Sequence, residues 1–226
     1  MLRNRGYKTI DLYGRSAEKI DAEVLDLQHG LQFVPMATVV GSDDVEVCRD
    51  ADVLVMTIGG VPKPGQTRLD LAEASVAICR NVLPPLLTVA PRAVVVVVTN
   101  PVDVITYATL KILGLPRNQV HGSGTSLDSS RLRSLIAAHC GVAVQSVHAY
   151  VAGEHGDSEI PLWSGATVGA VPIPEWDDEK LRPTSARERE DLAAQVIDAS
   201  RRYSSRRDFG FACPRAARNA RCNRLR

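Results

Sequence analysis

Four clusters of polar residues in this 226-residue sequence have the residue types that proton transfer and anion binding require. Each cluster follows a segment with the pattern of a β-strand, and ligands of doubly wound α/β sheets bind at the carboxyl ends of the strands. The clusters are the Gly- and Pro-rich loop 59–68, which ends in Arg68, the segment 99–103 with Asn100, the segment 122–131 with Asp128 and Arg131, and the loop 153–157 with His155.

Taken one at a time, the clusters have ordinary explanations. A plain turn explains the first, helix capping by Asp103 the second, an exposed i,i+3 ion pair the third and a solvated loop histidine the fourth. Segment 122–127 is also a partial G-x-G-x-x-G, a weak signal because Leu127 replaces the third glycine. Together, however, the clusters offer an imidazole, an acid to orient it, a carboxylate-binding arginine and a second arginine on a mobile loop. This set predicts hydride transfer to or from a 2-hydroxy acid.

The elements that must position these clusters alternate between strand and helix. Strands are predicted at 9–13, 53–58, 93–98 and around Val120, and helices at 17–28, 69–87, 103–113 and 126–140. Because parallel strands need crossover connections, this alternation predicts a doubly wound parallel α/β sheet with helices on both faces. Beyond Val142 the pattern changes to short strands, as in 146–152, and a last helix at 186–200. A second, smaller α+β substrate domain is therefore expected.

We expect an incomplete dinucleotide-binding domain at 1–122, a partial substrate domain at 123–199 and an arginine-rich tail at 200–226 that is not native to the fold. The tail holds nine of the 27 basic residues and a single acid, Asp208. A frameshift in GC-rich coding sequence explains both the arginine excess and the absence of a helical period. A genuine basic arm for nucleic acid is the alternative.

Composition and cysteine spacing exclude several classes of protein. Hydrophobic residues make up 45% of the chain and charged residues 23%, which is typical of a globular protein. The longest apolar run, 93–98, is far short of the roughly 20 residues that cross a bilayer. No apolar segment follows the basic N-terminus, and the five cysteines lack C-x-x-C spacing. These features predict a cytoplasmic protein without a membrane span, a disulfide framework or a metal site.

Three segments resemble the signature segments of the lactate/malate dehydrogenase family. They are 99–103 (TNPVD), 122–133 (GSGTSLDSSRLR) and 153–159 (GEHGDSE). The resemblance is nearly continuous from about residue 9 to residue 199. The strings at 122–125 and 153–159 are more similar to bacterial L-lactate dehydrogenases than to malate dehydrogenases.

The resemblance implies a role for each candidate residue. His155 would donate and accept the proton, and Asp128 would hold its ring and stabilise the imidazolium. Arg131 would bind the substrate carboxylate, and Arg68 would close over the carbonyl and polarise it. Asn100 would orient the substrate and the nicotinamide carboxamide. Pro62 lies at the position where lactate enzymes have glutamine and malate enzymes have arginine. Arg133 and His148 would belong to an allosteric fructose 1,6-bisphosphate site between subunits.

The resemblance implies NAD as the cofactor, with contacts at Gly14, Arg15, Gly59, Thr99 and Asn100. The acid that binds the adenosine ribose in the family aligns with Gly14, and Asp11 replaces it only if the register slips. Arg15 leaves NADP open, because a guanidinium suits a ribose phosphate.

Both ends of the chain depart from the family pattern. The glycine-rich pyrophosphate loop precedes the strand at Thr9, so we expect the first strand and its phosphate-binding turn to be missing. The family's final helices should follow Ser200, and the pattern of 201–226 does not match them.

The leading hypothesis is an oxidoreductase that transfers a hydride between NAD(H) and a small L-2-hydroxy acid, with L-lactate and pyruvate as the expected pair. The intact parent enzyme is expected to be a homo-oligomer without membrane or nucleic-acid partners. A malate dehydrogenase-like activity and an inactive fragment with a basic tail are the alternatives.

Overall fold

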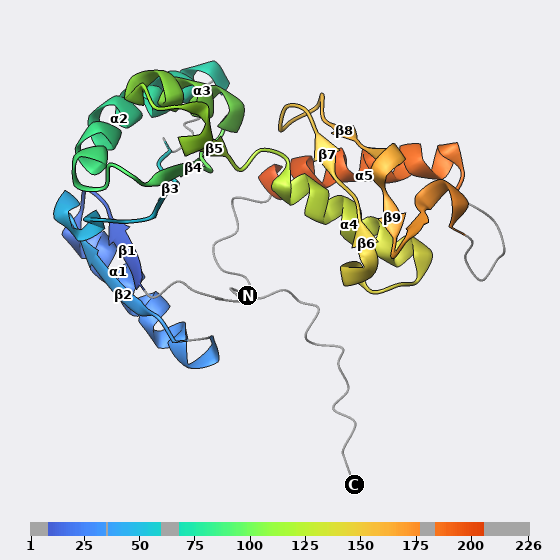
Figure 1. The fold of residues 1–226 in the computed structure, drawn as a ribbon, viewed down its shortest axis with the longest axis horizontal. Coiled ribbons are helices and arrows are strands. Elements are labelled where there is room, and N and C mark those ends of the chain that lie inside the picture. The colour runs from blue at the N-terminus through green and yellow to red at the C-terminus, as the bar shows by residue number, and fades with distance from the viewer. Residues whose placement is uncertain (1–8, 35, 60–67, 177–183, 206–226) are drawn as a thin grey trace, which may run out of the picture. The chain divides into compact units, whose positions relative to one another are not determined.

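Contacts within the computed structural model divide the chain into two compact units, Met1–Gly124 and Thr125–Arg226 (Figure 1). The structure describes residues 9–34, 36–59, 68–176 and 184–205. Within helices, the side chains of 68–70 and 200–205 are outside this description.

The first unit alternates between strand and helix as predicted, with one exception. Its elements are β1 (Thr9–Tyr13), α1 (Ala17–Gly30), β2 (Thr38–Ser42), β3 (Val53–Met56), α2 (Arg68–Val89), β4 (Val94–Val97), α3 (Val102–Leu113) and β5 (Val120–Gly122). Strand β2 is followed by β3 with only a short 3-10 helix, Val45–Cys48, between them. All strand pairs in this unit are parallel. They form two sheets, β1–β2 and β3–β4–β5, rather than one continuous sheet.

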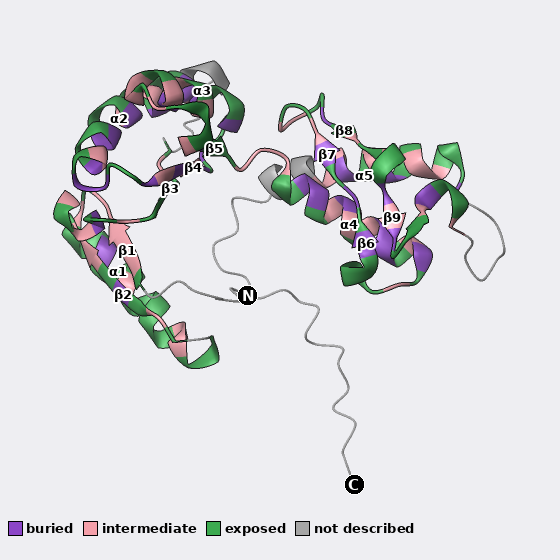
Figure 2. Cartoon of the chain, viewed as in Figure 1, coloured by how far each residue is buried: buried purple, intermediate pink, exposed green. Residues whose placement is uncertain are grey.

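The helices of the first unit bury strand β4 more completely than strand β3. Helices α2 and α3 pack against each other and contribute to one core with β4, where Val95 and Val97 are fully buried. On β3 the pattern alternates, with Leu54 buried and Val55 exposed (Figure 2). The described helices therefore bury only one face of β3, which lies within the strand predicted at 53–58.

The second unit combines two long helices with very short antiparallel strands. Its elements are α4 (Ser126–Cys140), β6 (Val147–His148), β7 (Val151–Ala152), β8 (Ile160–Pro161), β9 (Thr167–Val168), β10 (Val171–Pro172) and α5 (Ala186–Ser205). The strands pair as β10–β9–β6 and β7–β8. Helices α4 and α5 pack together, and Leu132, Ile136 and Val196 are buried in their shared core.

Several boundaries differ from the sequence-based expectation. Helix α5 continues to Ser205, five residues beyond the end predicted at Ser200. Strand β2 and strands β8, β9 and β10 were not predicted. The last three have two residues each, too few to show a period in the sequence.

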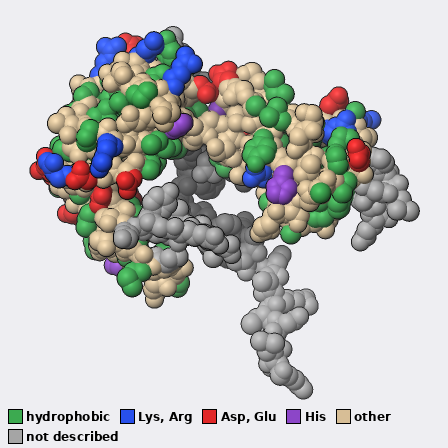
Figure 3. All heavy atoms as spheres, viewed as in Figure 1, with side chains coloured by type: hydrophobic (Ala, Val, Ile, Leu, Met, Phe, Trp, Pro, Cys, Tyr) green, Lys and Arg blue, Asp and Glu red, His purple; other side chains and the backbone are tan. Residues whose placement is uncertain are grey.

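The described surface carries mixed charge. Acidic and basic side chains are interspersed on the face shown in Figure 3. None of the helices in the described part of the chain has both the length and the hydrophobicity needed to cross a membrane.

Helix α1 approaches β2 so closely that glycine is required at position 41. A Cβ atom at Gly41 would lie 2.3 Å from Ile20 Cγ2 and 2.7 Å from Val24 Cγ2. Both neighbours are β-branched and held in a helix, so their methyl groups cannot rotate away freely. The contact fixes how α1 lies on the β1–β2 sheet.

We therefore expect Gly41→Ala to lower the free energy of unfolding by about 1–3 kcal/mol, the usual cost of overpacking. Urea unfolding of the two proteins measures this difference. Gly30→Ala is the matched control, because its added Cβ would meet no atom within 4 Å apart from its chain neighbours and the backbone of its own helix. Equal stability of the two variants would show that α1 yields without cost.

Candidate active site

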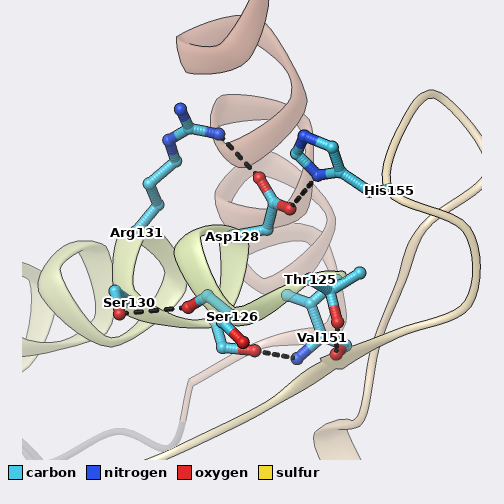
Figure 4. Close-up of polar contacts among 8 residues, drawn as sticks. Thr125, Ser126, Asp128, Ser130, Arg131, Val151 and His155 are labelled. Atoms are coloured by element: carbon cyan, nitrogen blue, oxygen red, sulfur yellow. Dashed lines mark hydrogen bonds and ion pairs between the residues drawn. The ribbon is translucent and has the colours of Figure 1, made fainter. Parts of the chain in front are cut away.

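A buried carboxylate in the second unit holds two of the predicted site residues. Asp128 Oδ1 accepts a hydrogen bond from Arg131 Nη1, and Oδ2 accepts one from His155 Nδ1, both at 2.6 Å (Figure 4). The Asp128 side chain is 1% exposed, whereas those of Arg131 and His155 are 18% and 19% exposed. The explanation of Asp128 and Arg131 as a merely exposed ion pair is therefore wrong.

Helix α4 buries Asp128 because of its periodicity. Asp128 precedes Leu132 by four residues and Ile136 by eight, so it lies on the apolar face of the helix. It also lies in the first turn of α4, where the helix dipole stabilises a negative charge. The buried carboxylate is thus accompanied by the Arg131 guanidinium and the His155 imidazole.

A second row of α4 side chains holds the backbone that leads to His155. Thr125 Oγ1 donates to the Val151 carbonyl at 2.6 Å, and the Val151 N–H donates to Ser129 Oγ at 2.9 Å (Figure 4). One turn further along, Arg133 Nε donates to the Ala149 carbonyl at 2.8 Å. Thr125, Ser129 and Arg133 are four residues apart, so their side chains lie in one row that follows segment 149–151.

The loop that carries His155 runs between the paired strands β7 and β8. It starts at Gly153, whose φ of +96° lies in the region that favours glycine. Because α4 fixes β7 and β7 pairs with β8, both ends of the loop are held. This arrangement places the imidazole on Asp128.

A second buried acid, Glu159, lies at the end of this loop and is 9% exposed. Burial and the negative charge of the nearby Asp128 raise the pKa of Glu159 from 4.5 to about 7, and a hydrogen bond to Asp128 raises it further. The positive charges of His155 and Arg131 lower this pKa and so offset part of the increase. Glu159 is not among the predicted site residues. The loop also contains Glu154 and Asp157, and no sequence signal separates the buried acid from these two exposed ones.

Asp128, His155 and Glu159 also have the composition of a cation site, with potential ligand atoms within 4.8 Å of one another. Both Asp128 oxygens, however, already accept hydrogen bonds, one of them from a guanidinium. A permanent positive charge bonded to a ligand disfavours a metal ion there. The arrangement of the cluster therefore does not fit a metal ion.

The expected cofactor contacts in the first unit lie at the ends of its parallel strands. Gly14 and Arg15 directly follow β1, and the Arg15 side chain is exposed. Gly59 lies beside the buried Thr99, since a Cβ at Gly59 would be 3.5 Å from Thr99 Cγ2. Asn100 is exposed and precedes a cis peptide bond to Pro101.

Asp11 lies within β1 rather than at its end. It pairs with Val40, and burial raises the pKa of its carboxyl group. The strand-end position belongs to Gly14 and Arg15.

The remaining predicted residues are placed as follows. Pro62 lies outside the described residues, and Arg68 begins α2 with a side chain that is also outside them. Arg133 stacks on the Tyr150 ring with its Cζ 4.6 Å from the centroid, and His148 is exposed on β6. Thr125 and Ser129, which fix β7, were not singled out by the sequence, because hydroxyl side chains at a helix start are common.

Comparison with known proteins gives the same family for both units. Residues 1–122 match the family described as lactate/malate dehydrogenase, NAD binding domain. Residues 125–203 match the lactate/malate dehydrogenase, alpha/beta C-terminal domain.

Curated relatives include two bacterial enzymes named L-lactate dehydrogenase. The enzyme of Bifidobacterium animalis subsp. lactis is 50% identical over 194 residues, which cover 85% of this chain and 61% of the relative. That of a Synechococcus species is 46% identical over 167 residues, covering 72% and 54%. The chain thus spans less than two thirds of the length of these relatives.

Solved structures agree with this assignment. A lactate dehydrogenase from a Medee basin deep-sea metagenome library superposes with a TM-score of 0.81 at 35% identity, covering 90% of this chain and 65% of that one. The minor L-lactate dehydrogenase of Enterococcus mundtii gives 0.80 at 36% identity, with the same coverage. The two-domain α/β fold is thereby confirmed, and the chain belongs to the lactate/malate dehydrogenase family.

Proposed function

We propose that this chain supplies the proton-transfer and substrate-binding residues of an NAD-dependent L-lactate dehydrogenase. The observation that carries the proposal is the buried Asp128 carboxylate, which bonds His155 through one oxygen and Arg131 through the other. The similarity to enzymes named L-lactate dehydrogenase supports lactate and pyruvate as the substrate pair.

His155 is the acid and base of this proposal. Its Nδ1 faces Asp128, so Nε2 is the ring nitrogen that exchanges a proton with the substrate oxygen. In the reducing direction the imidazolium donates a proton to the 2-oxo group, and in the oxidising direction the imidazole accepts the hydroxyl proton. Asp128 fixes the ring orientation and stabilises the imidazolium.

Arg131 binds the substrate carboxylate. A guanidinium presents a planar set of five N–H donors that matches a carboxylate in two parallel hydrogen bonds. Asp128 engages Nη1 and so orients the group from inside the protein. Charge-assisted bonds of this kind are roughly twice as strong as neutral ones.

The strand ends of the first unit fit a dinucleotide cofactor. At Gly59 a side chain would fill the space beside Thr99, and the exposed Asn100 amide offers both a donor and an acceptor. Gly59, Thr99 and Asn100 would hold the cofactor there, and Gly14 with Arg15 would contact its adenosine half. When bound, NAD supplies or accepts the hydride.

The partners of the protein are part of the same proposal. A small 2-oxo or 2-hydroxy acid is the substrate, and the working enzyme is a homo-oligomer. Exposed apolar side chains on α3, such as Val104 and Tyr107, support a contact with another copy of the chain.

The proposal is tested in a chimera in which this chain's residues replace the 194 matched residues of the Bifidobacterium animalis enzyme. We expect the chimera to reduce pyruvate with NADH. His155→Ala should lower kcat by about 10²- to 10⁴-fold, because general acid–base catalysis contributes that much. NADH oxidation gives the rate, and NADH fluorescence should show cofactor binding nearly unchanged.

The matched control is His139→Ala, a histidine in the last turn of helix α4. Its turnover should equal that of the unsubstituted chimera. A chimera that unfolds cooperatively, binds NADH and yet leaves pyruvate unreduced would refute the proposed function.

Substrate choice should depend on position 62, where the resemblance aligns Pro62 with the glutamine of lactate enzymes and the arginine of malate enzymes. Pro62 offers no charge to pair with a second carboxylate, and an unpaired charge in a closed site is costly. We expect kcat/KM for pyruvate to exceed that for oxaloacetate, and Pro62→Arg to shift the ratio toward oxaloacetate. A preference for oxaloacetate in the unsubstituted chimera would contradict the lactate assignment.

A further inference from the structure

Glu159 is a buried titratable group that the proposed proton transfer does not yet use. It directly precedes β8, and its residue is 9% exposed. One oxygen or nitrogen atom from each of Glu159, Asp128 and His155 lies within 4.8 Å of the other two. Three ionisable side chains therefore share one site.

The hydrogen-bonding pattern around Asp128 decides which form of Glu159 fits this site. A carboxylate offers about four lone-pair positions. Asp128 uses two of them for Arg131 and His155, so it can accept another hydrogen bond. An ionised Glu159 cannot donate one, whereas the protonated acid can.

The charges around Glu159 come from two elements. Asp128 and Arg131 face it from α4, and His155 faces it from its own loop. Burial and Asp128 together favour the neutral acid, and the two basic groups offset this only partly, so the pKa of Glu159 lies at about 7. At neutral pH the carboxyl group thus stands between its two charge states.

We propose that Glu159 is a positioning residue of this site, which in its protonated form donates a hydrogen bond to Asp128 and in its ionised form adds a second negative charge beside His155. The role in catalysis rests on the proposed function, since it assumes that His155 exchanges a proton with the substrate.

The two states of Glu159 have different consequences for His155. While Glu159 is protonated, Asp128 is the single anion of the cluster and balances Arg131. Once Glu159 ionises, two carboxylates act on the imidazole and favour its charged form. A change in the charge of Glu159 therefore acts directly on the imidazole of His155.

A purely structural carboxyl group would behave differently. It would fill space and bond to Asp128 without changing the proton occupancy of the imidazole. The titration of the His155 ring separates the two roles, because packing alone does not add a second step to it.

The experiment uses the 226-residue chain with isotope-labelled glutamate carboxyl carbons and histidine ring carbons, followed by NMR from about pH 4 to about pH 9. We expect the Glu159 carboxyl signal, assigned by its loss in Glu159→Gln, to titrate with a midpoint near 7. The His155 ring signal should follow two steps in the unsubstituted chain. The step that coincides with Glu159 should vanish in Glu159→Gln.

Glu154→Gln is the matched control, since Glu154 is an exposed acid of the same loop that bonds Ser158 at 3.0 Å. Both steps should remain in this variant. A Glu159 midpoint near the ordinary 4.5, or identical His155 curves with and without Glu159, would overturn the proposal.

Two features keep the test decisive. If Glu159→Gln fails to fold, Glu159→Asp supplies the assignment, and the midpoint in the unsubstituted chain still decides the question. The titration also needs no turnover, so a chimera without pyruvate reduction would refute the proposed function and leave this result standing.

Discussion

The burial of one negative charge, that of Asp128, constrains the second unit more than any other feature. An ionised carboxylate away from water is strongly unfavourable unless cations or donors surround it. Arg131, three residues along the same helix, meets one oxygen, and His155, from a distant loop, meets the other. The loop must therefore close on α4 for the charge to be satisfied. The same bonds that stabilise the carboxylate orient the imidazole and the guanidinium.

The first unit and the second unit use their elements differently. In the first, parallel strands end next to each other, so their register and the bond from Thr99 Oγ1 to the Ile58 carbonyl bring Gly59 beside Thr99. In the second, strands of two residues are too short to position a loop by themselves. Side chains of α4 perform this task, because Thr125, Ser129 and Arg133 bond segment 149–151 directly.

Local sequence signals predicted much of the fold, and the residues show why the rest was missed. Helix α4 was predicted with its observed bounds, since its apolar residues recur at helical spacing over fifteen positions. The candidate residues Asp128, Arg131 and His155 were found by type and resemblance, and the structure brings them together. The depth of Asp128 and the burial of Glu159 were not predictable, because both depend on how the loop 153–159 folds back onto α4. That contact joins residues almost thirty positions apart, and no pattern within either segment encodes it.

The row of bonds from α4 to segment 149–151 has a consequence for how such a site can diverge. Thr125, Ser129 and Arg133 bond main-chain atoms of segment 149–151, whereas Asp128 bonds the side chains of Arg131 and His155. Substitutions of Ala149 or Val151 by residues other than proline therefore keep the main-chain bonds, whereas a substitution of Tyr150 also removes the ring on which Arg133 stacks. The course of the chain into the loop thus depends little on side-chain identity at 149 and 151, while the chemistry of the site depends on three specific side chains.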